Sequence, residues 1–85
     1  MKITFKLYAS LVDYLPKTDL HSRHAVELDL PESTNVSQVI EKYQLPEQLT
    51  HLVLLNGHFL PPEERRDVIL KDDDTLAIWP PVAGG

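Results

Sequence analysis

Asn56 and Gly57 constrain the fold of this chain more than any other feature of its sequence, because an Asn-Gly pair is a strong signal for a β-hairpin. The tight turn that matches the twist of two strands needs a positive φ at both of its residues. The pair separates the apolar run Leu52–Leu55 from residues 58–60, and two prolines follow. The sequence therefore predicts two short antiparallel strands. The first is wholly apolar, so it is expected to be buried on both faces or nearly so.

Three further segments alternate apolar and polar residues, which is typical of strands with one buried face. They are residues 2–8, 24–30 and 75–79. The residues that this alternation places inward are Ile3, Phe5, Leu7, Val26, Leu28, Leu30, Leu76 and Ile78. The first and the last of these strands are apolar enough to lie in the centre of a sheet. Residues 68–70 are compatible with a short edge strand, whereas the charged residues 63–67 are expected to be solvated.

One amphipathic helix is predicted to begin at Asn35 and to end before Pro46. Asn35 can cap the first turn, and Gln38 three residues later completes a capping-box arrangement. The apolar face at helical spacing consists of Val36, Val39, Ile40 and Tyr43. A short helical turn is predicted over residues 9–15, with Ser10 as a candidate cap, and a polar loop over residues 17–23. This order of elements predicts an α+β fold in which one helix covers one face of a small mixed sheet.

The composition excludes several classes of function. A net charge of −5, from 8 basic and 13 acidic residues, argues against nucleic acid as a partner, since phosphate binding needs clustered Lys and Arg. No apolar run is long enough to span a membrane, and the N-terminal residues alternate charge and apolarity, unlike a signal peptide. A cytoplasmic location without membrane association is therefore expected. The absence of cysteine excludes a disulfide framework, a cysteine nucleophile and a thiolate metal site.

No set of side chains in the sequence suggests a metal site or a catalytic centre. The four histidines have no regular spacing, and Asp72, Asp73 and Asp74 lack the spaced ligands and the central glycine of a calcium loop. No serine stands in a Gly-x-Ser-x-Gly context. A bound metal and a self-sufficient enzyme are therefore not expected.

The C-terminal residues change from a strand into a tail that loses its side chains. Pro80 and Pro81 end the last strand, because proline has no N–H for a sheet ladder, and adjacent prolines favour an extended chain. In the stretch Val82-Ala83-Gly84-Gly85 the side chains shrink to nothing, so a narrow channel in another protein can admit this backbone. The sequence predicts one domain over residues 1–79 and a flexible tail over residues 80–85, whose functional group is the Gly85 carboxylate. The alternative is a merely frayed end.

The tail and several upstream segments together resemble one protein family. The segments are Leu7-Tyr8-Ala9, Asn35-Val36, Leu54-Leu55-Asn56-Gly57, the acidic stretch Lys71-Asp72-Asp73-Asp74-Thr75-Leu76, and the Pro-Pro-Val-Ala-Gly-Gly end. The chain is in this way similar to the sulfur-carrier family of molybdopterin-synthase small subunits and thiamine-biosynthesis sulfur carriers (MoaD/ThiS-like). The resemblance implies a ubiquitin-like β-grasp fold with about four to five strands and one main helix. Family members commonly have glycine where Asp73 stands, which implies a positive φ there.

The resemblance also implies a mechanism that acts at Gly85. An E1-like adenylyltransferase (MoeB/ThiF-like) uses ATP to convert the Gly85 carboxylate into an acyl-adenylate, and sulfur transfer then gives a C-terminal thiocarboxylate. The thiocarboxylate donates its sulfur to an acceptor, either a MoaE-like synthase subunit or a thiazole synthase. The lead-in Pro80-Pro81-Val82 favours the molybdopterin pathway over formation of the thiamine thiazole. The chain itself binds no cofactor in this mechanism, and its partners supply the catalysis.

Two questions stay open at the level of sequence. Trp79, Phe59 and Val82 are candidates for an apolar docking patch beside the tail, since aromatic residues are favoured in interface cores. The alternative for Trp79 and Phe59 is that they only help to cover the core. A ubiquitin-like protein modifier, whose Gly85 forms an amide with lysines of other proteins, and a non-covalent interaction module are alternatives to a sulfur carrier, because a fold does not fix a function.

Overall fold

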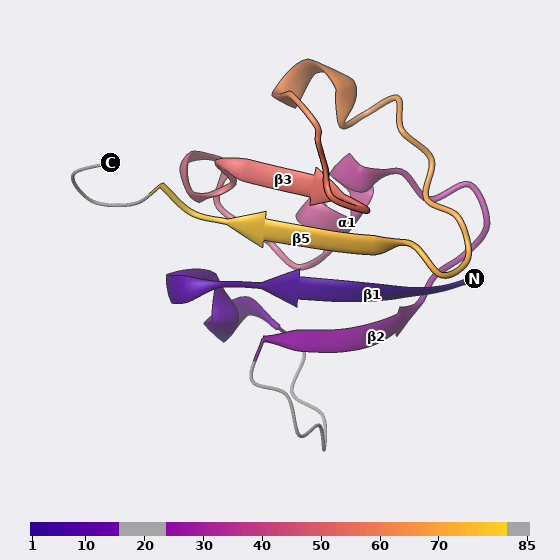
Figure 1. The fold of residues 1–85 in the computed structure, drawn as a ribbon, viewed down its shortest axis with the longest axis horizontal. Helices are drawn as coiled ribbons and strands as arrows, with labels where there is room; N and C mark the ends of the chain where they lie inside the picture. The colour runs from indigo at the N-terminus through magenta and orange to yellow at the C-terminus, as the bar shows by residue number, and fades with distance from the viewer. Residues whose placement is uncertain (16–23, 82–85) are drawn as a thin grey trace.

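The computed structural model describes residues 1–15 and 24–81, which form a five-stranded mixed sheet with one α-helix on one face (Figure 1). The strands are β1 (Lys2–Leu7), β2 (Ala25–Asp29), β3 (Leu52–Leu55), β4 (His58–Phe59) and β5 (Thr75–Trp79). The helices within these residues are α1 (Val36–Lys42) and the short 3₁₀ helices η1 (Ala9–Tyr14), η2 (Glu47–Leu49) and η3 (Pro62–Glu64). The predicted order of the main elements and the α+β layout are confirmed.

The first and the last strand lie side by side in the centre of the sheet. The strand order is β2-β1-β5-β3-β4, with β1 and β5 parallel and the other neighbouring pairs antiparallel. Phe5 pairs with Leu76, and Leu7 pairs with Ile78 (Figure 1). A parallel pair needs a long crossover connection, and this one contains α1. The prediction that the strands within residues 2–8 and 75–79 lie centrally is confirmed.

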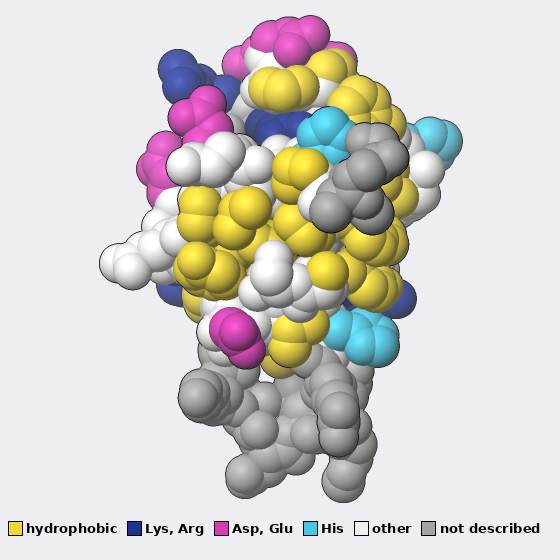
Figure 2. All heavy atoms as spheres, turned by 90° about the vertical axis from the view of Figure 1, so that its left-hand side faces the viewer, with side chains coloured by type: hydrophobic (Ala, Val, Ile, Leu, Met, Phe, Trp, Pro, Cys, Tyr) yellow, Lys and Arg dark blue, Asp and Glu magenta, His cyan; other side chains and the backbone are white. Residues whose placement is uncertain are grey.

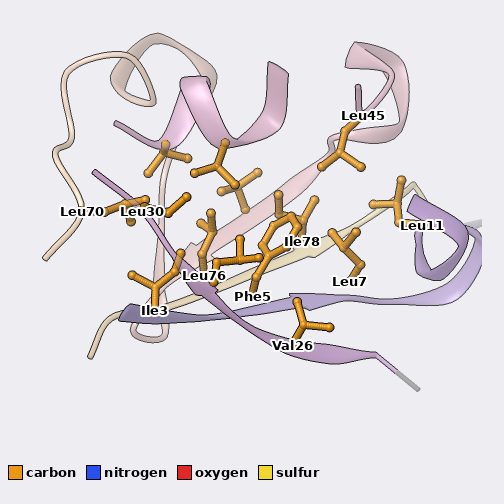
Figure 3. Close-up of a cluster of buried hydrophobic side chains, with 14 of the residues drawn as sticks. Ile3, Phe5, Leu7, Leu11, Val26, Leu30, Leu45, Leu70, Leu76 and Ile78 are labelled. Carbon is orange, nitrogen blue, oxygen red and sulfur yellow. The ribbon is translucent and has the colours of Figure 1, made fainter. Parts of the chain in front are cut away.

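The hydrophobic core lies between the sheet and α1 (Figure 3). Phe5, Leu7, Leu76 and Ile78 are fully buried in it. The other buried members of the core cluster are Ile3, Leu11, Val26, Leu28, Leu30, Val36, Val39, Leu45, Val53, Leu60 and Leu70. Every residue that the alternation placed inward is therefore in the core. Successive side chains of a strand point to opposite faces, so the alternate residues lie on the sheet face that α1 does not cover.

The start of α1 agrees with the prediction. The Asn35 side chain accepts a hydrogen bond from the Gln38 amide at 2.8 Å, and the Gln38 side chain accepts one from the Asn35 amide at 2.8 Å. These two bonds form a capping box, which satisfies two backbone donors that the helix itself leaves free. Val36 and Val39, on the predicted apolar face, are fully buried.

The C-terminal part of that apolar face lies at the edge of the core. Ile40 and Tyr43 are half-buried and pack against the core cluster. The Tyr43 ring lies 5.4 Å from the Phe5 ring, centroid to centroid. Because burial disfavours the charged phenolate, the pKa of Tyr43 is raised above its ordinary value.

The predicted hairpin turn forms, with φ angles of 51° at Asn56 and 85° at Gly57. β3 and β4 pair antiparallel on either side of the turn. The prediction that β3 is buried on both faces or nearly so holds only in part, because Val53 is buried and the other three residues of β3 are half-buried. The physical reason for Leu52 and Leu54 is that α1 covers one face of the sheet and they lie on the other, whereas Leu55 packs against the core cluster at the end of the strand.

Two predictions near the N-terminus have different outcomes. Ser10 is not the cap of η1, because it lies inside that helix and the N-cap residue is Tyr8, which makes no side-chain cap bond. The helical turn itself is confirmed as η1. The loop predicted over residues 17–23 lies outside the described residues.

Residues 63–70 differ from their predictions at two points. Residues 68–70 are not part of a strand, and Ile69 instead makes an isolated bridge with Asn35 at the start of α1. Residues 63–67 are not uniformly solvated, because Arg65 is only 6% exposed. Its guanidinium donates hydrogen bonds to backbone carbonyls, which is how a charged side chain can be accommodated inside the fold.

Candidate functional site

The site predicted from the sequence lies at the C-terminal end of β5. Trp79, the last residue of β5, is half-buried, Pro80 is buried and Pro81 is exposed. The predicted tail residues Val82, Ala83, Gly84 and Gly85 lie outside the described residues, so their role stays a prediction. The described part of the site is the base of the tail, which we define as residues 79–81.

The residues that flank β1 and β3 hold the end of β5 from both sides, directly before and at the base of the tail. The amide of Tyr8, just after β1, donates to the Ile78 carbonyl at 3.2 Å, and the amide of His51, just before β3, donates to the Trp79 carbonyl at 3.3 Å. The two prolines that follow have no N–H, so the ladder cannot continue through them. β5 ends at Trp79, which confirms that the strand stops at the prolines.

Trp79 lies on the sheet face opposite α1. Its neighbour Ile78 belongs to the core, and successive residues of a strand point to opposite faces. The Trp79 ring stacks on the Tyr8 ring, with centroids 4.1 Å apart and planes 1° apart, and the Tyr8 ring lies 5.1 Å from the His24 ring. Sequence analysis missed Tyr8 as a neighbour of Trp79, although the alternation in residues 2–8 places Tyr8 on this face.

Phe59 lies on the same face, in the edge strand β4. Its side chain is 53% exposed, and it pairs with Leu54, which in turn pairs with Ala77. Leu52 pairs with Trp79 in the same way. We define the open-face patch as six hydrophobic residues of this face that lie around Trp79 and Phe59, namely Tyr8, Leu52, Leu54, Phe59, Ala77 and Trp79.

The two described docking candidates, Trp79 and Phe59, thus share one face of the sheet with β3 between them. Trp79 is held by its stacking on Tyr8, whereas Phe59 presents about half of its surface to solvent. Figure 2 views the molecule from the end at which β5 finishes and shows hydrophobic side chains gathered there. The third candidate, Val82, lies outside the described residues.

The acidic turn lies at the opposite end of β5 from the base of the tail. Asp74 immediately precedes β5, and its carboxylate accepts hydrogen bonds from the Asn56 side chain and the Lys71 amide, both at 2.8 Å. Asp73 has a φ of 71°, as expected for a position where the family commonly has glycine. The length of β5 therefore separates this negative charge from the tail.

The part of the chain that the structure describes contains no group of three or more His, Cys, Asp or Glu residues that could hold a metal ion. Within residues 1–15 and 24–81, no helix has the length and apolar character that crossing a membrane requires. The side chains described around the base of the tail are aromatic and aliphatic, together with those of His24 and His51. The arrangement can therefore present a hydrophobic surface beside an emerging chain end.

Known structures share this arrangement of strands and helix. The chain is similar to SAMP1 from Haloferax volcanii (TM-score 0.66, 22% identity, covering 100% of both chains). It is equally similar to the thiamine biosynthesis protein ThiS from Geobacter metallireducens (TM-score 0.66, 21% identity, 100% of both chains). A third match is to the complex of subunits 1 and 2 of the molybdopterin-converting factor from Helicobacter pylori 26695 (TM-score 0.59, 19% identity, 100% of both chains). At these identities the likeness shows the fold, which is the ubiquitin-like β-grasp.

The sequence places the chain in a family within that fold. The ThiS family model matches residues 13–85, so the chain belongs to the ThiS family. No curated protein matches the chain in sequence. The predicted membership in the MoaD/ThiS-like sulfur-carrier family is therefore confirmed. Proteins of this family are small carriers or subunits.

Proposed function

We propose that this protein is a sulfur carrier whose Gly85 carboxylate is converted into a thiocarboxylate. The observation that supports this most strongly is the match to the ThiS family over residues 13–85, which includes the Gly84-Gly85 end. The base of the tail is compatible with the role. β5 is hydrogen-bonded as far as Ile78 on the β1 side and as far as Trp79 on the β3 side, and the two prolines then end the ladder.

The proposed chemistry has two steps, the first at the α-phosphorus of ATP and the second at the carboxyl carbon of Gly85. An oxygen of the Gly85 carboxylate attacks the α-phosphorus of ATP, and pyrophosphate leaves, which gives an acyl-adenylate. The sulfur of a hydrosulfide equivalent then attacks the acyl carbon, and AMP leaves with the electron pair of the broken C–O bond. Activation is necessary because a carboxylate is a poor electrophile until it carries a good leaving group. ATP binds to the partner adenylating enzyme in this scheme, and the carrier itself binds no cofactor.

The tail is long enough to enter a partner's active site while the folded body stays outside. The six residues 80–85 span about 20 Å when extended, and the terminal glycines bring no side chains into a narrow channel. We assign the contact of the body to the open-face patch, which contains Trp79 and Phe59, because aromatic residues are enriched in interface cores. The partners supply the catalytic groups, so the protein acts as a carrier and not as an enzyme.

Two partners follow from this role. An E1-like adenylyltransferase (MoeB/ThiF-like) activates Gly85 in the cytoplasm, and a synthase subunit accepts the sulfur. The lead-in Pro80-Pro81-Val82 favours molybdopterin formation over thiamine-thiazole formation. The similarity to the complex of molybdopterin-converting-factor subunits from Helicobacter pylori supports a MoaE-like subunit as the acceptor.

The intact mass of the protein tests the carrier role. After incubation with ATP, a sulfur donor and the cognate adenylating enzyme, the mass should rise by the difference between sulfur and oxygen. A variant that lacks residues 84–85 should show no rise. The matched control is Glu32→Gln, which changes an exposed residue in the turn after β2 and should be loaded like the wild type.

Three outcomes distinguish the alternatives, and the second and third need acceptor proteins added to the same mixture. An unchanged mass, with the enzyme shown to be active on a known carrier, would overturn the proposal. Recovery of Gly85 in an amide bond to a lysine of another protein would favour a ubiquitin-like modifier. Loaded protein that gives its sulfur to a thiazole synthase, and not to a MoaE-like subunit, would overturn the choice of pathway only.

A further inference from the structure

Arg65 is a buried cation held entirely by backbone carbonyls. Its Nε donates to the Leu60 carbonyl at 3.1 Å, Nη1 to the Thr50 carbonyl at 3.0 Å, and Nη2 to the His51 carbonyl at 3.3 Å. Among residues 1–15 and 24–81, no carboxylate lies within ion-pair distance of this guanidinium. The side chain therefore serves as a three-way donor to the main chain and is not one half of a salt bridge.

The buried position removes water from the charged guanidinium of Arg65, which disfavours its charged form. Burial lowers the pKa of Arg65 below its ordinary value, and the negative charge of Glu63 offsets part of that shift. The three hydrogen bonds from a charged donor compensate for the lost water, and the planar fork of the guanidinium can reach carbonyls that point from different segments. A lysine has a single nitrogen on a flexible stem, so it cannot reproduce this geometry.

The three carbonyls come from both ends of the β3–β4 hairpin. Thr50 and His51 lie just before β3, and Leu60 lies just after β4. The Arg65 carbonyl also accepts a hydrogen bond from the Ser37 amide in α1 at 3.1 Å. In Figure 1 the segment around η3, drawn in orange, lies beside β3 and α1. Arg65 thus ties the hairpin and the helix together at one point.

One of the residues that Arg65 holds is also the last partner of β5. The His51 carbonyl accepts from Arg65, and the His51 amide donates to the Trp79 carbonyl at 3.3 Å. Beyond Trp79 the next residue is Pro80, which cannot donate to a ladder. The His51–Trp79 bond is therefore the final rung between β3 and β5 before the tail begins. A shift of His51 would change where and in which direction the tail leaves the sheet.

We propose that Arg65 is a positioning residue for the base of the tail: by fixing His51, it holds the Trp79 carbonyl and so fixes the point at which the chain leaves the sheet for a partner's active site. This inference rests on the proposed carrier function. Arg65 does not touch the reacting carboxylate, and it acts only through His51 and the base of the tail. The competing explanation is that Arg65 merely stabilises the fold.

The test compares Arg65→Lys and Arg65→Gln with Asn35→Ala. Asn35→Ala removes the cap of α1 and lowers stability, and Asn35 itself makes no hydrogen bond to His51, to Trp79 or to the Arg65 side chain. Two variants at Arg65 are used so that one suffices if the other does not fold. The free energy of unfolding of each variant is measured first, to show that the control is destabilised to a similar extent.

The first readout is hydrogen exchange at the His51 amide in the isolated protein. If Arg65 positions His51, this amide should exchange about tenfold faster in an Arg65 variant than in Asn35→Ala, because the rung to Trp79 opens without global unfolding. The second readout is the rate of thiocarboxylate formation by the cognate adenylating enzyme. The variant should show a kcat about tenfold lower at a nearly unchanged KM, because the docking surface is intact and only the tail is misdirected.

The outcomes separate this inference from the proposed function. Equal His51 exchange in the Arg65 variants and in Asn35→Ala would overturn the inference, and so would an equal kcat in these variants when the wild type is loaded normally. Failure of the wild type to be loaded would overturn the carrier function and with it the role of directing the tail. In that case faster His51 exchange would still show that Arg65 fixes His51.

Discussion

Phe59 and Ile69 provide a matched pair of residues to test the open-face patch. Both are large exposed hydrophobic residues, with 53% and 47% of their side chains exposed. Phe59 lies in the patch, paired with Leu54 in the sheet, whereas Ile69 lies outside it and bridges to Asn35 at the start of α1. If the adenylating enzyme docks on the patch, Phe59→Ala should weaken the complex and Ile69→Ala should not.

The expected loss of affinity follows from the exposed area of Phe59. A phenylalanine has roughly 200 Å² of surface, so 53% exposure leaves about 100 Å² for a partner to cover. Alanine retains about a third of this area, so about 70 Å² of contact is lost, at about 25 cal/mol per Å². The product is about 1.7 kcal/mol, which corresponds to a Kd about 15-fold higher.

Isothermal titration calorimetry of the carrier with the cognate adenylating enzyme measures this loss. The Kd should rise about 15-fold for Phe59→Ala and less than about twofold for Ile69→Ala. Both residues are exposed, so each variant should keep its free energy of unfolding within about 1 kcal/mol of the wild type. Urea denaturation checks that the folded body is intact before the affinities are compared.

Three results would refute the reasoning in different ways. An unchanged Kd for Phe59→Ala would show that the partner does not cover β4. Equal losses in the two variants would indicate a general hydrophobic contact without a preferred face. A loss confined to Ile69→Ala would place the partner near the start of α1, away from the open-face patch.

Substitutions at three further positions test local features of the fold. Asp73→Gly should raise the free energy of unfolding by about 0.5 kcal/mol, because the φ of 71° at Asp73 costs glycine less than a residue with a Cβ. Asp73→Ala removes the same charge but keeps the Cβ, so urea denaturation that ranks it above Asp73→Gly would contradict this explanation. Gly57→Ala should lower stability by about 1–2 kcal/mol, because the φ is 85° although an added Cβ would meet nothing within 4 Å. A change below about 0.3 kcal/mol in the same assay would mean that the turn relaxes. The raised pKa of Tyr43 means that the folded state favours the protonated hydroxyl, so this contribution to stability is complete below about pH 10 and is lost as the pH rises further. Tyr43→Phe should therefore lose less stability between about pH 8 and about pH 11 than the wild type, and parallel curves would contradict the assignment.

The strands and the main helix could be predicted because their signals are local. The capping box of Asn35 and Gln38 and the turn at Asn56 and Gly57 each depend on the backbone geometry of a few consecutive residues. The inward residues of β1, β2 and β5 follow from a period of two. β3 has four apolar residues and no alternation, so its burial depends on where α1 lies, and it is less buried than the sequence predicts.

Arg65 and the stacked rings depend on contacts that no local pattern specifies. A charged residue among Glu and Arg neighbours is usually solvated, and the carbonyls that hold Arg65 come from separate segments of the chain. Tyr8 and Trp79 are in contact because β1 and β5 pair in parallel, and the register that pairs Leu7 with Ile78 places the next two residues side by side. For the C-terminal tail the sequence is more informative than the structure. Its composition is informative in the sequence, while the described structure contributes only its base.

The tail begins from a strand that the sheet holds on both sides, and this suits a carrier. β5 pairs with β1 and with β3, and its residues Leu76 and Ile78 are 0% exposed. A partner that binds the tail exerts a force on Trp79. To open the end of β5, this force would have to break the hydrogen bonds to the chain segments on both sides of the strand. Local opening becomes costlier as buried apolar contacts and protected hydrogen bonds increase, so the end of β5 resists fraying. By contrast, the edge strand β4 has two residues, both exposed. Exposed residues such as Phe59 can contact different partners in turn, while the central strand keeps the point from which the tail departs unchanged.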